Sequence, residues 1–250
     1  MGLVLRILQV SDTHLRAPGA DVSGRTAPDI DPAARLDTVL AAVAATGFVP
    51  DAVVHTGDIA DDGSPEGTGA VWERLRAIAP VVVGVPGNHD DPTVVGAIFG
   101  RPVAHLGAWR IGGVDTSIPR EVAGRVDPLI ALLENPDELV APGAEPEFVL
   151  LAMHHPLRSR STHEWFVLPG AGGAEEAVTR HTEVRGVLSG HTHEAFEATL
   201  ASGARLLGGP ATYYGIAHSG LEFTKAPGTA GARLLDLHDD GRIDTWVVPA

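Results

Sequence analysis

The chain of 250 residues predicts an α/β fold. Apolar runs of strand length alternate with helical repeats through the first half of the chain. At least four of these runs lead directly into a segment that carries Asp, Asn or His. The part after Gly190 consists of short β segments between turn residues. Because parallel strands end at one edge of a sheet, polar residues just past successive strands indicate a site at that edge.

The first half of the chain consists of predicted strands and helices in alternation. Three of the helices start with Asp or Ser followed by Pro, which is an N-cap and a proline at the first helical position. This spacing implies parallel strands with right-handed crossovers. The predicted elements are strand Leu3–Val10, a helix from Asp31 to Gly47, strand Ala52–His55, a helix from Ser64 to Ile78, strand Val81–Val85, helix Pro92–Phe99 and a helix from Asp127 to Leu133.

The second half is richer in β segments. Trp109–Ile111 and Val114 flank Gly112-Gly113, which we expect to form a hairpin turn. Phe148–Met153 is a predicted strand, whereas Arg158–Gly173 lacks periodicity and is predicted to be a long surface loop beside the site. Without linkers or repeats, residues 1–250 are expected to form one domain. The last predicted strands are Ala195–Leu200, Arg205–Leu207, Ala232–Leu237 and Ile243–Val248.

Composition excludes several kinds of protein. The chain has no cysteine, so it has neither disulfides nor a thiolate zinc site, and its absence fits a reducing compartment. A formal net charge of −14 argues against binding to long nucleic acid or an anionic membrane. No apolar run approaches the ~20 residues that span a bilayer, and no cleavage site follows the first strand. We therefore expect a cytoplasmic protein.

Metal-capable side chains are concentrated in five short segments. In an extended chain, residues two positions apart point the same way, so Asp12 and His14 would converge on one cation, and His191 and His193 likewise. Asp58 offers one carboxylate oxygen to each of two ions. Mixed imidazole, carboxylate and amide donors suit Fe, Mn, Zn or Co. The segments are Ser11-Asp12-Thr13-His14, Thr56-Gly57-Asp58, Pro86-Gly87-Asn88-His89-Asp90, Met153-His154-His155-Pro156 and Gly190-His191-Thr192-His193.

These segments, in this order, resemble the calcineurin-like metallophosphoesterase superfamily. Ser11–Leu15, Thr56–Asp61, Gly87–Asp91, Val114–Ser117 and Met153–Pro156 are most similar to its class III 3′,5′-cyclic-nucleotide phosphodiesterases. The resemblance spans residues 3–216. It implies a four-layer α/β/β/α sandwich with two mixed β-sheets, and it implies that the protein is an enzyme that hydrolyses phosphoric diesters.

The resemblance also assigns roles to the donors. It implies that Asp58 bridges two ions of Fe, Mn or Zn and that His89 lies outside both ligand sets, near the leaving group. Two ions ~3.5–4 Å apart lower the pKa of a bridging water, whose hydroxide then attacks the phosphorus. Asp58 and His89 are the expected catalytic residues. One expected ligand set is Asp12, His14, Asp58 and His193; the other is Asp58, Asn88, His154 and His191.

The predicted substrate is a small phosphodiester. Two divalent ions with two carboxylates and one hydroxide leave a charge of about +1, which a diester monoanion neutralises and a monoester dianion exceeds. The resemblance implies 3′,5′-cyclic nucleotides such as cAMP as the first substrate class, and it leaves 2′,3′-cyclic nucleotides and glycerophosphodiesters as alternative substrates. It also allows a homodimer. A phosphomonoesterase or protein phosphatase is the alternative, and it would need arginines around the site. A non-catalytic binding module on this scaffold would have lost ligands, and none is lost here.

Substrate contacts are less specific in the sequence. His155 follows a predicted ligand and either contacts substrate or supports that ligand. Arg16, Arg158 and Arg160 could pair with phosphate, and Trp165 could stack on a base, although a solvated loop is the alternative for all four.

Three other polar residues have expected structural roles. His55 is expected to pack within its strand, and Asp115 to bond to its own loop. Asp90 is expected to orient His89 or a nearby loop.

Overall fold

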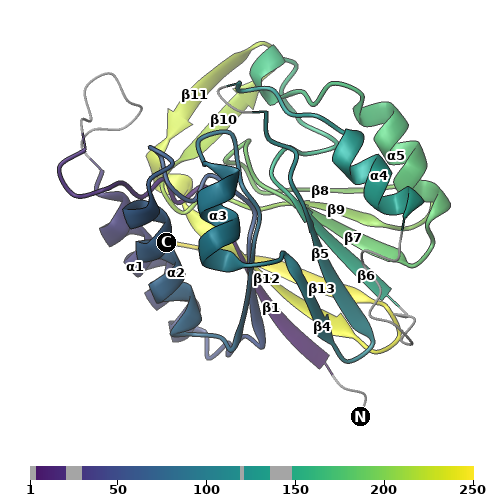
Figure 1. The fold of residues 1–250 in the computed structure, drawn as a ribbon, viewed down its shortest axis with the longest axis horizontal. Coiled ribbons are helices and arrows are strands. Elements are labelled where there is room, and N and C mark those ends of the chain that lie inside the picture. The colour runs from purple at the N-terminus through teal and green to yellow at the C-terminus, as the bar shows by residue number, and fades with distance from the viewer. Residues whose placement is uncertain (1–3, 21–29, 119–120, 136–147) are drawn as a thin grey trace.

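The computed structural model describes residues 4–20, 30–118, 121–135 and 148–250. It contains two large β-sheets that pack face to face, with helices α1, α2 and α3 outside one sheet and α4 and α5 outside the other (Figure 1). These layers confirm the predicted α/β/β/α sandwich with two mixed sheets. No helix within the described ranges is both long and apolar enough to cross a membrane.

The first sheet has the strand order β13-β12-β1-β2-β3. Its strands β1, β2 and β3 are parallel, while β12 pairs antiparallel with both β1 and β13. The strands are β1 (Val4–Val10), β2 (Ala52–His55), β3 (Val81–Gly84), β12 (Gly231–His238) and β13 (Ile243–Pro249). The helices on this side are α1 (Pro32–Ala45), α2 (Pro65–Arg76) and α3 (Pro92–Phe99).

The second sheet has the order β4-β5-β6-β7-β9-β8, in which β5, β6, β7 and β9 are parallel and the two edge strands antiparallel. Its strands are β4 (Val103–Leu106), β5 (Trp109–Val114), β6 (Phe148–Met153), β7 (Val184–Ser189), β8 (Phe196–Thr199) and β9 (Arg205–Gly208). The helices are α4 (Asp127–Glu134) and α5 (Ala171–Arg180). The smaller elements are η2 (Glu164–Phe166), η3 (Pro227–Thr229) and the hairpin β10 (Gly215–Ser219) with β11 (Glu222–Ala226).

Three apolar cores hold these layers together. The middle core lies between the sheets and includes Ile7, Ile111 and Leu150, all fully buried. The outer cores lie between each sheet and its helices, with Leu36 of α1 in one and Leu129 of α4 in the other. Burying both faces of the sheets excludes water from most of the strand residues.

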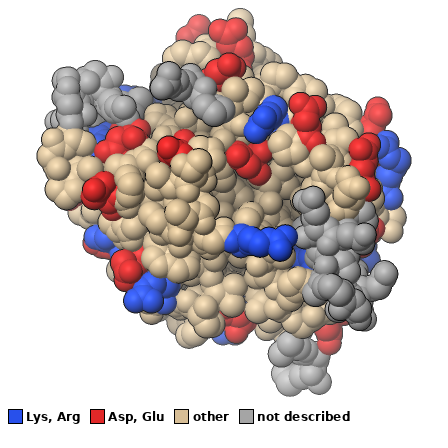
Figure 2. All heavy atoms as spheres, viewed as in Figure 1, with Lys and Arg blue, Asp and Glu red and all other residues tan. Residues whose placement is uncertain are grey.

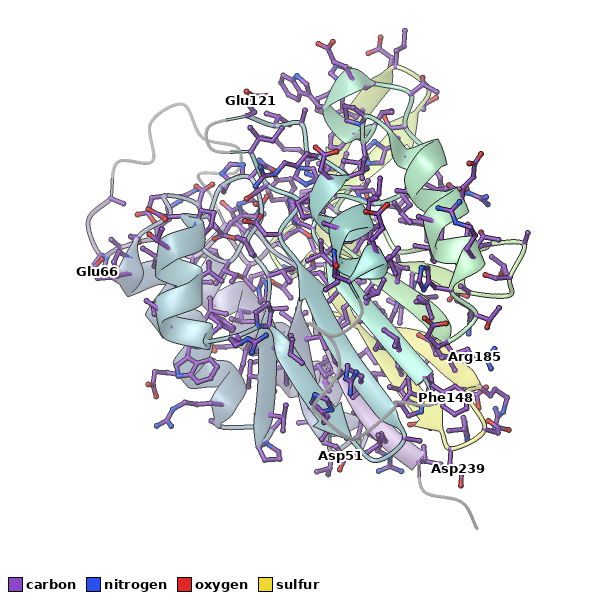
Figure 3. The ribbon with its side chains drawn as sticks, turned by 45° about the vertical axis from the view of Figure 1, so that its right-hand side comes forward. Asp51, Glu66, Glu121, Phe148, Arg185 and Asp239 are labelled. Carbon is purple, nitrogen blue, oxygen red and sulfur yellow. The ribbon has the colours of Figure 1, made fainter. Side chains whose placement is uncertain are left out.

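The parallel strands of each sheet end at the same edge. In the first sheet Val10 of β1 pairs with His55 of β2, and His55 with Gly84 of β3. The motif segments follow directly after these strands and after β6 and β7. At the opposite end of the sheets lie Asp51, Phe148, Arg185 and Asp239, where the Arg185 guanidinium carbon is 5.1 Å from the Phe148 ring centroid (Figure 3).

The helix starts predicted at Asp31 and Ser64 are confirmed by their caps, whereas α4 starts at Asp127 without a side-chain cap, because Val126 is the residue at its N-cap. The Asp31 carboxylate accepts a hydrogen bond from the Ala33 amide, 2.9 Å, and the Ser64 hydroxyl accepts one from the Gly67 amide, 3.1 Å. The second predicted helix is shorter than expected, since α2 ends at Arg76 and Ile78 is 37% exposed.

The predicted hairpin turn at Gly112-Gly113 is wrong. Strand β5 runs through both glycines, and the turn lies earlier, where Leu106 of β4 pairs with Trp109 of β5. A Cβ on Gly113 would lie 2.6 Å from both the Pro102 and Val85 side chains, so this glycine permits close packing and makes no turn.

The predicted surface loop at Arg158–Gly173 is only partly correct. It contains η2, and its end is the first turn of α5. Phe166 and Leu168 are buried, at 6% and 4% exposed. The sequence reasoning missed α5, β4, β7 and the β10–β11 hairpin. Three glycines at positions 170, 172 and 173 hid the start of α5, because glycine disfavours helix.

Candidate metal centre

The candidate ligands stand on an unusual backbone. Within the described ranges, positive φ among non-glycine residues is confined to Asp12, His14, Asp58, His191 and His193, at 49° to 68°. The extended backbone expected for Asp12–His14 and His191–His193 is therefore wrong. Such left-handed conformations cost about 1–3 kcal/mol each and are retained where the surrounding structure imposes them. Here the left-handed φ values accompany the approach of Asp12, His14 and His193 to Asp58.

Close packing of glycine supports this geometry. The amide of Gly190 donates to the carbonyl of His154, 3.0 Å. A Cβ on Gly190 would clash with the Ser11 hydroxyl and would lie 2.8 Å from Asp12 Oδ2 and 2.9 Å from the Thr56 carbonyl oxygen. The close backbone approach expected at Gly190 is confirmed.

A first cluster of four donors brings together Asp12, His14, Asp58 and His193, all buried and with ligand atoms within 4.8 Å of one another. The Nε2 atoms of His14 and His193 are 3.2 Å apart. His193 Nε2 is 3.3 Å from Asp12 Oδ1, and His14 Nε2 is 3.7 Å from Asp58 Oδ2. Two carboxylates and two imidazoles at this spacing fit a divalent transition metal ion.

A second set of donors also meets at Asp58, at the same carboxylate oxygen, Oδ2, that His14 approaches. His154 Nε2 lies 3.5 Å from Asp58 Oδ2 and 3.1 Å from Asn88 Oδ1. The His191 ring lies beside them, with its centroid 5.0 Å from that of His154. Asp58 is thus in contact with both groups, as a bridging carboxylate must be.

The second ring nitrogen of each histidine is held by an oxygen. His14 Nδ1 donates to Asp61 Oδ1, 3.3 Å. His154 Nδ1 donates to the Thr56 carbonyl and His193 Nδ1 to the Tyr214 carbonyl, each at 2.8 Å. With Nδ1 held in this way, Nε2 is the nitrogen that faces the cluster and is left to coordinate a cation. Fixing the tautomer in this way is what a metal-ligating histidine requires.

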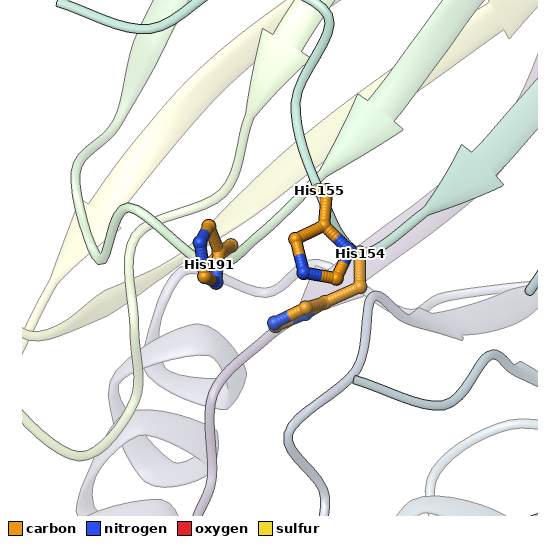
Figure 4. Close-up of side chains that lie close together, drawn as sticks. All are labelled: His154, His155 and His191. Carbon is orange, nitrogen blue, oxygen red and sulfur yellow. The ribbon is translucent and has the colours of Figure 1, made fainter. Parts of the chain in front are cut away.

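His191 is held in the opposite sense. Its Nε2 donates to the carbonyl oxygen of Trp165, 2.6 Å, which leaves Nδ1 as the atom with a lone pair. Burial and the neighbouring His154 lower the pKa of His191 to about 4, so the ring is neutral and able to bind a cation. Figure 4 shows the ring of His191 facing those of His154 and His155.

The carboxylates and His154 form a strongly coupled charge cluster. Burial raises the pKa of Asp12 and of Asp58, but His193 and His154 outweigh it for Asp12, and His154 and His89 for Asp58. Both carboxyls therefore have a pKa below the ordinary value and are ionised. Burial lowers the pKa of His154, but the charge of Asp58 outweighs this and raises it to about 9.

His89 is oriented by Asp61, which the sequence reasoning did not single out. His89 Nδ1 lies 3.1 Å from Asp61 Oδ1, and its backbone amide donates to Asp58 Oδ1, 2.9 Å. Burial lowers the pKa of His89, but Asp58 and Asp61 raise it to about 9. The same Asp61 carboxylate holds His14 and accepts from Arg16 Nε, 2.7 Å. The available signal was its position three residues after Asp58 in a buried turn.

Asp90 supports a loop and not the His89 ring. Its carboxylate accepts hydrogen bonds from the amides of Ile59, Ala60 and Gly87, at 3.0, 2.8 and 2.8 Å. It therefore ties the turn that carries Asn88 to the turn that carries Asp58. Burial and the nearby Asp58 raise the pKa of Asp90 to about 7.

His55 and Asp115 have the structural roles expected of them. His55 is fully buried and contacts the Thr13 hydroxyl through Nε2, 3.1 Å. Asp115 accepts from the amide and hydroxyl of Ser117, two residues on, at 2.8 and 2.6 Å.

The predicted substrate-contacting residues have partners within the protein. His155 uses both ring nitrogens, one with the Thr116 hydroxyl, 2.9 Å, and one with the Val122 carbonyl, 3.0 Å. Arg158 and Arg160 form ion pairs on the surface with Glu175 and Glu194. Arg16 bonds to Asp61, as above. Of the five residues, Trp165 lines the pocket at the candidate ligands.

The site opens into a pocket of about 150 Å³. His89 and Trp165 stand on its exposed side, at 36% and 47% exposed. Among the described residues that line it there is no arginine or lysine. Figure 2 shows one face of the protein, on which Lys and Arg are interspersed with Asp and Glu and form no continuous basic stripe.

Comparison with known proteins agrees with this geometry. The chain is 30% identical to a 3′,5′-cyclic adenosine monophosphate phosphodiesterase of Pseudomonas aeruginosa, over 96% of this chain and 88% of that protein. It is 34% identical to a cAMP/cGMP dual specificity phosphodiesterase of Mycobacterium tuberculosis, over 78% of this chain and 63% of that one. A solved dimetal phosphatase from Danio rerio shares the fold, with a TM-score of 0.62, 16% identity and 98% of both chains covered. The family model described as calcineurin-like phosphoesterase matches residues 5–195, so the chain belongs to that family of metal-dependent phosphoester hydrolases.

Proposed function

We propose that the protein hydrolyses small phosphodiesters with two metal ions, and that its substrates are 3′,5′-cyclic nucleotides such as cAMP. The observation that carries the proposal is the pair of donor groups in contact with one carboxylate, Asp58, at the floor of a small pocket. The two named relatives act on cyclic nucleotides, which supports the substrate class.

The donor chemistry fits two divalent ions. Each histidine of the proposed sets has one nitrogen held by an oxygen and the other left to coordinate. We propose Fe, Mn or Zn, because mixed imidazole and carboxylate donors suit these metals. When bound, two such ions would stabilise charge on the phosphoryl oxygens and acidify a water molecule. The proposed sets are Asp12, His14, Asp58 and His193 for one ion, and Asp58, Asn88, His154 and His191 for the other.

His89 is the proposed proton donor to the leaving alkoxide. Its Nδ1 bonds to Asp61, so Nε2 is the nitrogen that faces the pocket. Asp61 stabilises the protonated ring and fixes its direction, and the bond from the His89 amide to Asp58 ties it to the bridging carboxylate. A positioned acid of this kind contributes a factor of about 10²–10⁴ to the rate.

The charge of the pocket favours diesters over monoesters. A monoester carries a second negative charge, which is usually met by arginine. The arginines predicted to contact phosphate are instead paired with Asp61, Glu175 and Glu194. A phosphomonoesterase or protein phosphatase thus has less support than a diesterase.

The test compares bis-aryl with mono-aryl phosphate, with and without a chelator, and then a panel of 3′,5′-cyclic nucleotides, 2′,3′-cyclic nucleotides and glycerophosphodiesters. Metal content is measured on the same samples. The proposal expects chelator-sensitive activity with diesters preferred. Activity that survives complete metal removal would overturn the mechanism, and a preference for the monoester would overturn the substrate class.

The rest of the proposal concerns the state of the protein in the cell. We propose a cytoplasmic location, in line with the absence of cysteine, and a single domain, in line with the continuous packing of the two sheets. We also propose a homodimer, which the family resemblance suggests. A single cooperative unfolding transition and the mass in sedimentation equilibrium test the last two points. Fractionation of cells tests the first.

A further inference from the structure

One side of the pocket is a wall of apolar and aromatic side chains. The donors and His89 form the floor. The other described residues that line the pocket are Val122, Trp165, Phe166, Tyr214, Ile216 and Phe223. Val122 precedes α4, and the rest come from η2, from β10 and β11 and from the residue before β10, regions that carry none of the five motifs.

The aromatic rings of this wall form a continuous series that begins at a candidate metal ligand. The ring centroids of His191 and Phe166 are 5.6 Å apart. Phe166 lies 5.2 Å from Phe223, and Phe223 lies 5.8 Å from Trp165. These are ordinary aromatic contacts, so the wall is a packed unit in which Trp165 is the outermost ring.

The Trp165 side chain is exposed, yet contacts within the protein hold it in place. The short helix η2 turns Phe166 inward, at 6% exposed, and Trp165 outward, at 47%. His163 caps that helix by accepting a hydrogen bond from the Trp165 amide, 3.2 Å, and its ring lies 5.2 Å from the rings of both Trp165 and Phe223. A large indole held this way beside a reactive site is suited to contact a ligand.

The wall offers little that could read the polar edge of a base. Apart from the Tyr214 hydroxyl and the Trp165 indole N–H, its six described residues carry no hydrogen-bonding side-chain group. Stacking on a ring depends on the flat face of the ligand, which every nucleobase has. The wall is therefore suited to a planar aromatic group without regard to its identity.

We propose that Trp165 and Phe223 form a subsite that stacks on the nucleobase of the substrate while its phosphate is held at the metal-binding floor, and that this subsite accepts purines and pyrimidines alike. The proposal rests on the proposed phosphodiesterase function. It adds the residues that bind the base and the kind of selectivity they impose.

The chain allows the ring to be removed without disturbing the metal ligand. Trp165 holds His191 through its backbone carbonyl, which Trp165→Ala retains. The matched control is Trp246→Ala, since Trp246 is a similarly exposed indole, at 40%, on strand β13 and outside the pocket.

The experiment measures kcat and KM of the metal-loaded protein, of Trp165→Ala and Phe223→Ala and of the control. The substrates are cAMP and methyl β-ribofuranoside 3′,5′-cyclic phosphate, which has the same diester ring without a base. Each pocket variant is expected to raise KM for cAMP about 5- to 100-fold more than KM for the baseless substrate. The control should leave both values unchanged. For the unaltered protein, the KM values for the 3′,5′-cyclic monophosphates of adenosine, guanosine, cytidine and uridine should agree within about tenfold.

Equal changes for cAMP and the baseless substrate in both pocket variants would overturn the subsite while the phosphodiesterase function stands. A large preference for one base would overturn its indifference to the base. If the unaltered, metal-loaded protein hydrolyses neither substrate, the proposed function itself fails. Circular dichroism of each variant verifies that the fold is retained.

Discussion

The donor floor and the aromatic wall line one pocket but are built in different ways. The floor consists mostly of buried side chains at the ends of parallel strands; five of its donors have a left-handed φ, and a further oxygen holds the rings of His14, His154 and His193. The wall consists of rings on a short helix and a small hairpin, and its outermost member is half exposed. Hydrogen bonds join the two, from His191 Nε2 to the Trp165 carbonyl and from His193 Nδ1 to the Tyr214 carbonyl.

The difference separates chemistry from selectivity. Reaction geometry tolerates little displacement, and the floor has the rigid backbone and saturated hydrogen bonding that such precision needs. The wall makes contacts that depend on surface area and tolerate changes in shape. Altering the floor should therefore change rate and metal binding, whereas altering the wall should change which substrate is preferred.

The largest effect is expected at the pocket side of the floor. His89→Ala should lower kcat about 10²–10⁴-fold with a simple diester, because it removes the proposed proton donor. Asn88→Ala should reduce the metal content as well, because it removes a proposed ligand. Steady-state kinetics and elemental analysis check both. His181→Ala is the control, since that histidine pairs with Glu183 away from the site. Full activity of His89→Ala would remove this residue from the mechanism.

Metal affinity should depend on pH through His154. In the metal-free protein the pKa of His154 is raised to about 9, so the ring carries a proton at pH 7 that a bound cation must displace. Affinity should therefore rise about tenfold per pH unit between pH 7 and pH 9 and then level off. His191, with its pKa lowered to about 4, is already neutral and adds nothing to this slope. Calorimetry in buffers of different ionisation enthalpy measures the proton release; none at pH 7 would contradict the coupling.

The Ser11 hydroxyl, which holds the Asp12 carboxylate, should affect metal affinity less than a ligand does, but by a measurable amount. The Thr56 hydroxyl donates to the Ser11 hydroxyl, 2.7 Å, which donates to Asp12 Oδ2, 2.5 Å. Ser11→Ala breaks this series and should weaken metal binding about 10–100-fold. Competition with a chromogenic chelator gives the affinity. Ser161→Ala, which removes a hydroxyl bonded to the Gly220 carbonyl outside the floor, should leave it unchanged.

The smallest expected effect is on the stability of the fold, and it is tested by comparing alanine substitutions at two glycines. Gly190→Ala should destabilise the fold by about 1–3 kcal/mol, because its Cβ would collide with the Thr56 backbone and with Asp12. Gly172→Ala, in α5 and with open space around it, should instead stabilise by about 0.5–1 kcal/mol. Urea unfolding of the metal-free proteins measures both. Equal stability of the two variants would show that the close approach at Gly190 costs nothing to disturb.

Sequence reasoning succeeded where local chemistry is repeated in order. The strand ends, the helix starts at Asp31 and Ser64 and the five donor segments are readable because capping and strand length are local properties. It failed where a glycine is compatible with two structures, a turn or a closely packed strand. Gly112-Gly113 reads as a turn, yet Gly113 lies within β5 because its neighbour Pro102 leaves no room for a side chain.

The two-residue spacing of the donors correctly predicted that their side chains converge, but the reason given for it was wrong. Residues two apart were expected to point together in an extended chain, whereas the structure turns each donor by a left-handed φ. Asp61 went unnoticed because its role is to contact His14 and His89, which are 47 and 28 residues away along the chain. No pattern within a single segment contains that information.

By itself, the sequence determined the α/β class and the ordered series of Asp, Asn and His residues, because both are properties of consecutive residues, and the resemblance carried by that series implied the layers and the family. The tertiary structure alone decided which nitrogen of each histidine is left to coordinate, that Asp61 orients His89, and that Trp165 and Phe223 stand together over the floor. Trp165 and Phe223 are 58 positions apart, and only the folding of η2 against the β10–β11 hairpin brings their rings into contact.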